Sequence, residues 1–460
     1  MTYEEFLQTK KVIACPTGFD VEPSELNQSL LPFQCDIVKW AVKRGKAALF
    51  TMTGTGKTIM QLAWADAITN KIDRDVLILT PLAVAEQTIE EGLKFGIKVH
   101  GVRKQEDVGP GLNIANYEIL HHFDPSRFGA IVLDESSILK SFDGKTRKQL
   151  MEFSKDIPYK LACTATPSPN DYMELGNHSE FLGIMSYVEM LATYFVHDGA
   201  DTAKWRLKGH AETEFWKWLA SWGVFLCTPS DLGYSNEGFE LPELITHEHV
   251  VPSMASEGML FAMEVRGLSE RRGARKESLE RRVKLCCDIV ANSPKPFMVW
   301  CGLNIESELL KKSIPCSVEV KGSDTDEHKK RSLLDFAHGK IDVLISKSSI
   351  AGFGMNWQVC SNTAFVGVSD SFEMMFQATK RFHRKGQKNT VNRHFITSEA
   401  EGSVIANIKR KERDFMAMIG NMVQHTKDIT QINIKSAKNE KNKYTTAKIK
   451  LPEWIKEGGY

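Results

Sequence analysis

The chain has 460 residues, 42% of them apolar, which is enough for two or three domains with cores of their own. Its 59 basic and 58 acidic residues nearly cancel, which excludes a general polycation, so any nucleic-acid surface has to be local. The nine cysteines include no CxxC pair, which argues against structural zinc. The sequence has no run of about 18 apolar residues, so we expect no membrane-spanning helix. With no signal-like N-terminus, we expect a soluble cytoplasmic protein with free thiols.

From Leu31 to about Pro167, short apolar runs alternate with longer amphipathic segments. Near-continuous apolar runs of this length are typical of a parallel sheet that is covered on both faces. The first set of candidate strands is 47–50, 76–79, 112–115, 130–133 and 159–162, and the second is 297–300, 318–320, 342–345, 363–366 and 391–395. The pattern predicts two α/β domains with a helical piece between them.

Composition divides the chain into five parts: an N-terminal extension (1–24), a first α/β domain (25–171), a helical insertion and connection (172–253), a second α/β domain (254–425) and a basic, mostly disordered tail (426–460). The charged stretch 254–284 predicts a solvated helix, with a phosphate-contacting strip as the alternative. The insertion holds Trp205, Trp216, Trp218 and Trp222. They could stack on bases, but the i, i+4 spacing of the last two is typical of core residues, and we expect burial.

A glycine-containing loop follows the first candidate strand and precedes a helix-like segment. Its glycines allow successive backbone N–H groups to close around phosphate oxygens, and the helix start adds its positive end. Lys57 would neutralise the β- and γ-phosphates of ATP, and Thr58 would bind Mg²⁺. The alternative is a glycine turn before an ordinary helix. The predicted ATP-binding loop is Thr53, Gly54, Thr55, Gly56, Lys57 and Thr58.

Two carboxylates end the strand-like run 130–133. Asp134 could hold the metal through water, while Glu135 could polarise the attacking water. The next candidate strand ends near Thr164 and Thr166, whose hydroxyls could bond the acidic pair and report the state of the nucleotide. Each signal is weak alone, and the prediction depends on their order after the phosphate-binding loop.

A basic segment at 377–387 carries Gln377, Arg381 and Arg384. On a helix, this i, i+4, i+7 spacing puts the three side chains on one face. Arginine suits bidentate contact with a γ-phosphate, so the segment predicts arginine fingers that a separate domain carries to the nucleotide. The alternative is a basic, solvated helix. A split site of this kind suits a protein that converts ATP hydrolysis into relative motion of two domains.

Taken in order, these segments resemble the motifs of superfamily 2 helicases, and within them the Snf2-like branch of DNA-dependent ATPases. The resembling segments are 31–34 with Trp40, 54–58, 80–82, 116–118, 134–137 with Lys140, 164–167, 352–356 and 377–387. They cover about residues 25–415, and the ending His383–Gln387 favours the Snf2-like branch over RNA helicases of the DEAD-box type. The compactness of the chain resembles the small Snf2-like helicases of bacteriophages and prophages.

The resemblance implies two tandem RecA-like domains with a helical bridge, and it assigns roles to residues. Gln34 would read adenine, and Asp134 would join Thr58 in holding Mg²⁺. Catalysis would fall to Glu135, Arg381, Arg384 and Gln377, and coupling to Thr164 and Thr166. Nucleic-acid contacts would come from Thr80, Pro81, Asn116, Gly352 and Asn356.

Three positions depart from the usual pattern: Ser136–Ser137 replaces Ala-His or Ala-Asp, Thr51 replaces a small residue, and the 348–350 segment is loose. These departures concern coupling rather than ATP binding. We therefore expect an ATP- and Mg²⁺-dependent DNA helicase or translocase, a monomer that binds DNA without sequence preference, in phage or prophage replication or recombination. An RNA-directed superfamily 2 helicase and a nucleotide-gated loading or binding module are the alternatives.

Overall fold

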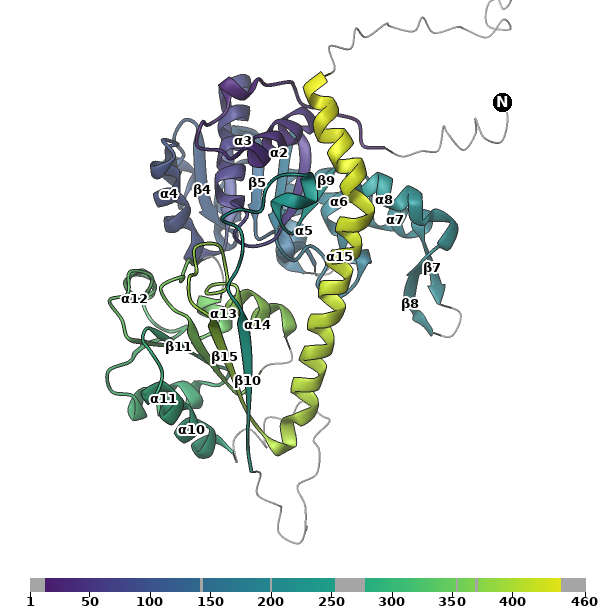
Figure 1. Cartoon of the computed structure of the whole chain (residues 1–460). Helices are drawn as coiled ribbons and strands as arrows, with labels where there is room; N and C mark the ends of the chain where they lie inside the picture. Colours follow the sequence, from purple (N-terminus) through teal and green to yellow (C-terminus); the bar gives the residue numbers. More distant parts are fainter. Residues whose placement is uncertain are drawn as a thin grey trace, which may run out of the picture.

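The computed structural model describes residues 13–140, 144–198, 201–252, 278–352, 355–368 and 371–439. Two α/β domains lie one above the other in Figure 1, and one long helix runs along both of them. Each domain holds one parallel sheet. The two predicted RecA-like domains are thus confirmed. Within the described residues, no helix combines the length and apolar character needed to cross a membrane.

The first sheet has seven strands in the order β3-β4-β2-β5-β6-β1-β9. Its strands are β1 (Lys46–Thr51), β2 (Asp75–Thr80), β3 (Val99–Gly101), β4 (Leu112–Asn116), β5 (Phe128–Asp134), β6 (Tyr159–Thr164) and β9 (Gly223–Leu226). Both faces are covered, since Leu77 packs in one apolar cluster and its neighbour Ile78 in another. The accompanying helices are α2 (Pro32–Arg44), α3 (Lys57–Ile72), α4 (Ala85–Lys94), α5 (Lys145–Ser154), α6 (Leu175–Leu182), α7 (Tyr187–Tyr194) and α8 (Glu212–Ala220).

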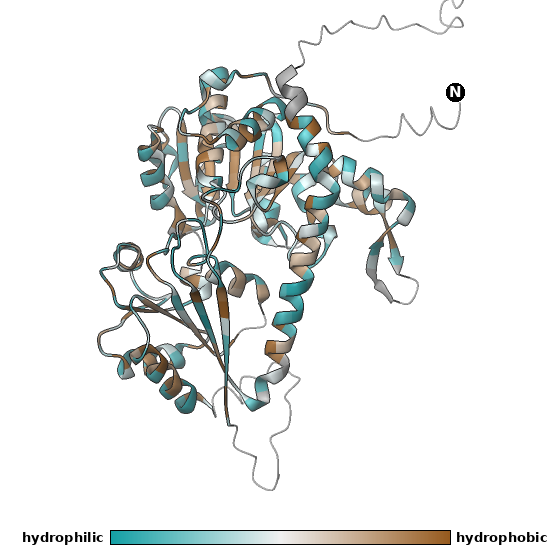
Figure 2. Cartoon of the chain, in the orientation of Figure 1, coloured by the Kyte–Doolittle hydropathy of each residue, from teal (hydrophilic) through white to brown (hydrophobic). Residues whose placement is uncertain are grey.

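The second sheet has six strands in the order β10-β15-β14-β11-β13-β12. They are β10 (Leu244–Val251), β11 (Phe297–Cys301), β12 (Val318–Val320), β13 (Val343–Lys347), β14 (Asn362–Val366) and β15 (Val391–Ser398). Its helices are α10 (Leu279–Ala291), α11 (Asn304–Ser313), α12 (Asp326–Ala337), α13 (Ser348–Ala351) and α14 (Phe372–Thr379). Apolar residues follow the strands and polar residues the outer helix faces in both domains (Figure 2). All ten candidate strands are present, because their apolar side chains fill these cores.

The 172–253 segment is less helical and less separate than expected. It forms a hairpin of β7 (Phe195–Asp198) and β8 (Asp201–Leu207), gives β9 to the first sheet, and gives β10 to the second. β9 joins because its four residues are buried beside β1, with Val224 opposite Leu49. The boundaries drawn around 172–253 therefore do not coincide with the sheets.

The tryptophans of this segment are mainly core residues, as expected. Trp216, Trp218 and Trp222 are 4%, 1% and 0% exposed. Trp205 is half-buried on β8, where its ring lies 3.7 Å from that of His197, measured between centroids. A base-stacking role for the three buried rings is excluded by this packing.

The expected disordered tail is corrected by helix α15 (Gly402–Asn439), which includes residues 426–439. Met422, Thr426, Thr430 and Ile434 recur every four residues, and all four are buried. This stripe faces the first domain, where Gln431 Nε2 donates to the carbonyl of Asp231 at 3.0 Å. Packing orders a segment whose composition predicted disorder. Residues 440–460 lie outside the described residues.

The charged stretch 254–284 lies mostly outside the described residues, which resume at Ser278. Its described end starts α10, and there Arg282 is fully buried rather than solvated. The guanidinium donates to Glu306 Oε1 at 2.8 Å, which links α10 to α11. Arg282 is thus neither solvated nor available to a phosphate, whereas Glu280 and Lys284 of the same helix are exposed, as the solvated-helix prediction expects.

Candidate active site

The loop between β1 and α3 has the backbone that phosphate binding requires. Gly54 and Gly56 have φ of +91° and +89°, a region that residues with a Cβ avoid. A Cβ on Gly54 would lie 2.9 Å from the backbone nitrogen of Lys385, and one on Gly56 would lie 2.2 Å from Gln34 Nε2. Both glycines are therefore required by conformation and by space, and the loop touches the second domain through Lys385.

Two side chains of the loop, Lys57 and Thr53, bear on phosphate binding. Lys57 Nζ donates to the carbonyl of Thr51 at 2.8 Å, and burial lowers its pKa, against which the charges of Glu135 and Asp134 act. The hydroxyl of Thr53 is buried without a hydrogen-bond partner. Buried hydroxyls are normally paired, so a ligand oxygen is a fitting partner for this one.

Gln34 of α2 holds the phosphate-binding loop in place through a hydrogen bond to its backbone. It is 5% exposed on α2; its Nε2 donates to the carbonyl of Thr55 at 2.7 Å, and its Oε1 accepts from the backbone N–H of Leu31 at 2.9 Å. The predicted adenine contact of Gln34 stays a prediction, since the amide here bonds the phosphate-binding loop.

The acidic pair stands at the end of β5. Glu135 has a φ of +53°, which is unusual for a residue with a side chain and marks a constrained backbone. The Tyr117 hydroxyl donates to the carbonyl of Asp134 at 2.6 Å and fixes this corner. Burial raises the pKa of Asp134 to about 7, with Glu135 adding to the shift and Lys57 opposing it.

Hydroxyls from the end of β6 reach the acidic pair. Thr164 Oγ1 lies 3.5 Å from Glu135 Oε2 and accepts the backbone N–H of Thr166 at 3.1 Å. Thr166 Oγ1 in turn accepts from Gln377 Nε2 of the second domain at 3.2 Å. The two predicted coupling residues thus form a bonded path from Glu135 to the other domain.

Arg381 completes this contact from the second domain. Its Nη2 lies 4.0 Å from Glu135 Oε1, and the side chain is 2% exposed. The same guanidinium donates to Gln377 twice, from Nε to the backbone carbonyl and from Nη2 to Oε1, each at 3.0 Å. Burial lowers the pKa of Arg381, while Glu135 and Asp134 counter the shift.

The expected single helix from Gln377 to Arg384 is wrong. α14 ends at Thr379, and both arginines follow in turns. Beyond the helix, the backbone N–H of Arg381 donates to the carbonyl of Ala378 at 3.2 Å, and the Gln377 carbonyl, one of the last of the helix, accepts instead from the Arg381 side chain. Arg384 is nevertheless partly buried beside the site: its Nε is buried without a hydrogen-bond partner, and burial lowers its pKa to about 10.

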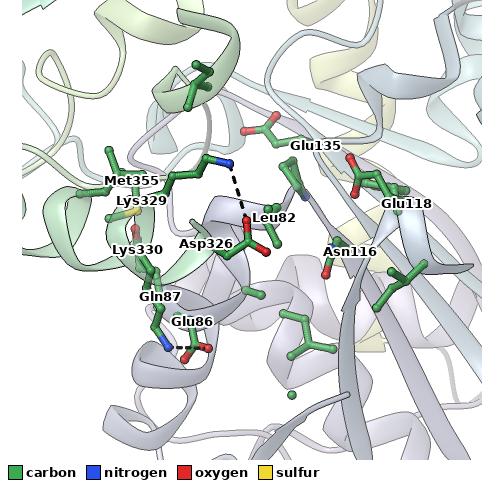
Figure 3. Close-up of a pocket in the computed structure, with 18 of the residues that line it drawn as sticks. Leu82, Glu86, Gln87, Asn116, Glu118, Glu135, Asp326, Lys329, Lys330 and Met355 are labelled. Carbon is green, nitrogen blue, oxygen red and sulfur yellow. Dashed lines mark ion pairs between the residues drawn. The ribbon is translucent and has the colours of Figure 1, made fainter. Parts of the chain in front are cut away.

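A cavity of about 1150 Å³ opens between the domains beside this site. Figure 3 shows Leu82, Glu86, Asn116 and Glu118 of the first domain around it. Across from them, α12 contributes Lys330, which pairs with Glu86 at 2.8 Å, and Lys329, which pairs with Asp326 at 3.6 Å. Both of these lysines are thus held by carboxylates.

The five predicted nucleic-acid contacts are distributed unevenly. Pro81 and Asn116 line the cavity, whereas Thr80, Gly352 and Asn356 do not. A Cβ on Gly352 would lie 2.2 Å from the carbonyl oxygen of Ser348, so this glycine serves a close backbone approach. Asn356 Nδ2 donates to Glu91 Oε1 of the first domain at 2.8 Å.

Sequence reasoning missed several residues of this region. Glu91 is one; His178 of α6 is another, with Nε2 3.1 Å from the hydroxyl of Ser136 at one of the unusual positions. Burial lowers the pKa of His178 to about 4, so the ring is neutral at pH 7. Lys140, already named with the 134–137 segment, makes a contact that the sequence did not predict: it pairs across the cleft with Glu373. Each of these contacts joins distant parts of the chain, so no local sequence pattern predicts it.

Comparison with curated proteins found a partial match. A curated mouse protein described as "DNA annealing helicase and endonuclease ZRANB3" is 27% identical over 170 residues, which make up 33% of this chain and 16% of that protein. The chain thus matches about a sixth of the length of this relative. No family model matches the sequence. The chain resembles Snf2-like superfamily 2 proteins.

Among solved structures, this chain matches the structure described as "Sulfolobus solfataricus SWI2/SNF2 ATPase core in complex with dsDNA". It covers 91% of this chain and 98% of that chain at 16% identity, with a TM-score of 0.41. A score this low does not establish a shared arrangement of the two domains.

Proposed function

We propose that this protein is a nucleic-acid-dependent ATPase that moves along DNA. The observation that carries the proposal is the convergence of Lys57, Glu135 and Arg381 at one point between two domains, with the partly buried Arg384 beside them. A phosphate-binding lysine, a carboxylate that can polarise water and a pair of arginines are the parts that phosphoryl transfer needs. Their division between domains links hydrolysis to domain movement.

The bound substrate in this proposal is ATP with Mg²⁺. The N–H groups of the glycine loop and Lys57 would hold its phosphates, and Thr58 and Asp134 would hold Mg²⁺, which supplies charge neutralisation at the phosphate oxygens. The unpaired Thr53 hydroxyl and Arg384 Nε fit such a ligand. Glu135 would accept a proton from the attacking water, and Arg384 would stabilise charge on the transferring phosphoryl group.

DNA is the substrate we propose for the interdomain cavity. Support comes from Pro81 and Asn116, two of the predicted nucleic-acid contacts, which line it. Contacts to phosphates carry no sequence information, so binding would be non-specific and sensitive to salt. The mouse relative is described as a DNA annealing helicase, which favours DNA over RNA for this chain. A role in phage or prophage replication or recombination remains a prediction from the compact sequence.

ATP hydrolysis by the purified protein tests the proposal. It is measured without nucleic acid and with duplex DNA, single-stranded DNA or RNA, for the wild type, Lys57→Ala and Glu135→Gln. We expect stimulation by DNA, and both variants should lose turnover but keep DNA binding. Stimulation by RNA alone would favour the RNA-directed alternative, and no stimulation by any nucleic acid would favour the nucleotide-gated module. Loss of DNA binding in both variants would contradict the division of roles.

A further inference from the structure

Two short segments, one from each domain, meet beside the proposed active site. The first, 135–140, directly follows β5 and carries Glu135 at its start and Lys140 at its end. The second, 373–381, is most of α14 with the turn after it, and carries Glu373 at its start and Arg381 at its end. Arg381 Nη2 lies 4.0 Å from Glu135 Oε1, so the start of the first segment touches the end of the second.

The opposite ends of the two segments are joined by an ion pair. Lys140 Nζ donates to the carboxylate of Glu373. One helical turn later on α14, Gln377 Nε2 donates to Thr166 Oγ1 of the first domain at 3.2 Å. Residues four apart share one face of a helix, so Glu373 and Gln377 attach the same face of α14 to the first domain. Arg381 follows directly after this attached helix.

The ion pair depends on both of its members. The Glu373 side chain is 8% exposed and that of Lys140 is 41% exposed. The amide of Asn177, which is 2% exposed, donates from Nδ2 to the backbone carbonyl of Lys140 at 3.2 Å and anchors the turn that carries the ammonium. A buried carboxylate that loses its counter-charge is strongly destabilised. Removal of Lys140 would therefore drive Glu373 toward water and loosen the start of α14.

We propose that Lys140 and Glu373 are positioning residues, which hold α14 against the first domain so that Arg381 reaches Glu135. This inference rests on the proposed function. Both residues line the interdomain cavity, as does Glu135, which Figure 3 shows there. The pair therefore joins the domains where the proposed DNA cavity adjoins the ATPase site. Neither side chain touches ATP in this scheme; the pair acts through α14.

ATP hydrolysis at saturating DNA tests the inference in the full-length protein, with Lys140→Met, Glu373→Gln and the double variant. A misplacement of about 1 Å can cost on the order of 100-fold in rate, so each single variant should lower kcat about 10- to 100-fold. The KM for ATP and the Tm should stay near the wild-type values, because the glycine loop and both sheets are unchanged. Residues that act through one shared contact are not additive, so the double variant should lose no more than either single variant.

Two further variants separate the charge of Lys140 from its mere presence. Lys140→Arg keeps a cation that can pair with Glu373, so it should retain most of the wild-type kcat. Lys148→Met removes an exposed lysine of α5 in the same domain and should match the wild type. A loss in K140R as large as that in K140M would contradict the ion pair as the cause.

Other outcomes would also overturn the inference. Losses that multiply in the double variant would show that the two residues act separately, and a Tm that falls together with kcat would show a merely structural role. A higher DNA concentration for half-maximal stimulation in K140M but not in E373Q would make Lys140 a nucleic-acid contact instead. Wild-type turnover in both single variants would exclude any role in positioning. Failure of the proposed function is distinguishable, since the wild type itself would then show no stimulation by any nucleic acid.

Discussion

Arg384 is a partly buried arginine whose Nε is buried without a hydrogen-bond partner. If it contacts the γ-phosphate, Arg384→Ala should lower kcat at saturating DNA on the order of 10³–10⁵-fold. Arg384→Lys should recover little, because an ammonium cannot make the bidentate contact of a guanidinium. Steady-state ATPase assays measure both, with Arg410→Ala, an exposed arginine of α15, as the control. Near-normal turnover of R384K would contradict this role.

A second residue-scale prediction concerns pH and His394 on β15. Its ring stacks on His247 at 4.5 Å between centroids, and Nδ1 lies 3.0 Å from His249 Nε2. Burial lowers the pKa of His394 to about 4, and the charges of His247 and His249 act in the same direction. The ordinary value is 6.5. Between these values, the unfolded chain binds a proton that the folded chain does not, so the free energy of unfolding falls as pH falls from about 6.5 to about 4.

Thermal unfolding followed across this window checks the effect. We expect the Tm of the wild type to fall toward low pH, and the Tm of His394→Gln to fall less steeply, since glutamine does not titrate. His178, whose pKa is also lowered to about 4, keeps part of the dependence in both proteins. Parallel curves for the two proteins would show that His394 is not responsible.

At the residue scale, the sequence predicted the parts of the site that local spacing encodes. The glycine loop, Asp134 with Glu135, and the arginines of 377–387 are brought together by the structure. The sequence did not predict the contacts of Glu91 and His178, because their partners lie far away in the chain. Asn356 is 265 positions from Glu91, and Ser136 is 42 positions from His178. Such contacts follow from how the domains meet, which no window of sequence contains.

At the scale of elements, α15 is attached to both domains. Phe415 packs against Phe372 and Phe376 of the second domain, with ring centroids 5.3 and 5.2 Å away. Three turns later, His425 stacks on Trp216 of the first domain at 5.0 Å. Figure 1 shows the helix, in yellow, running beside both domains.

The attachment to the first domain yields a matched pair of variants. Met422 is fully buried, whereas Met416 on the same helix is 46% exposed. Met422→Ala should lower the free energy of unfolding by about 2–5 kcal/mol, because it removes buried methylenes and leaves a cavity. Met416→Ala should change it by no more than about 0.5 kcal/mol. Denaturant titrations measure both, and equal effects would show that the stripe does not secure the helix.

The elements that the sequence did not reveal share a physical cause. The expected strands are continuous apolar runs, such as 130–133, whose burial the composition alone predicts. β10 carries His247, Glu248 and His249 in its middle, and it is a strand because it pairs with β15 over its whole length. The 426–439 segment is rich in polar residues, and its helix depends on a stripe that only the first domain completes.

At the scale of the whole molecule, partly exposed ion pairs join the two domains beside the cavity. Lys330 and Glu86 form such a pair at 2.8 Å, with side chains 49% and 48% exposed. An exposed pair contributes about 0–1 kcal/mol, so its loss should loosen the contact without unfolding either domain. The Glu86→Gln/Lys330→Gln variant should therefore populate more open arrangements than the wild type at low salt.

Energy transfer between dyes placed one on each domain measures this opening. The control is Glu214→Gln/Lys217→Gln, a pair of similar exposure within α8. High salt should make the wild type resemble the variant, since the Debye screening length falls from about 10 Å at 0.1 M to about 3 Å at 1 M salt. Equal transfer efficiencies in wild type and variant at low salt would show that this pair does not hold the cleft.

The path of the chain limits how the two domains can move. The backbone leaves the first domain after β9, builds the second domain from β10 onward, and returns along α15 to end its described part against α8. The second domain is therefore held at two points rather than suspended from one linker. With both attachments in place, the β9–β10 connection and α15, the second domain can rotate only about the axis through them. Under the proposed function, opening and closing of the cleft would follow this one rotation, which returns Arg381 to Glu135 in each cycle of ATP hydrolysis.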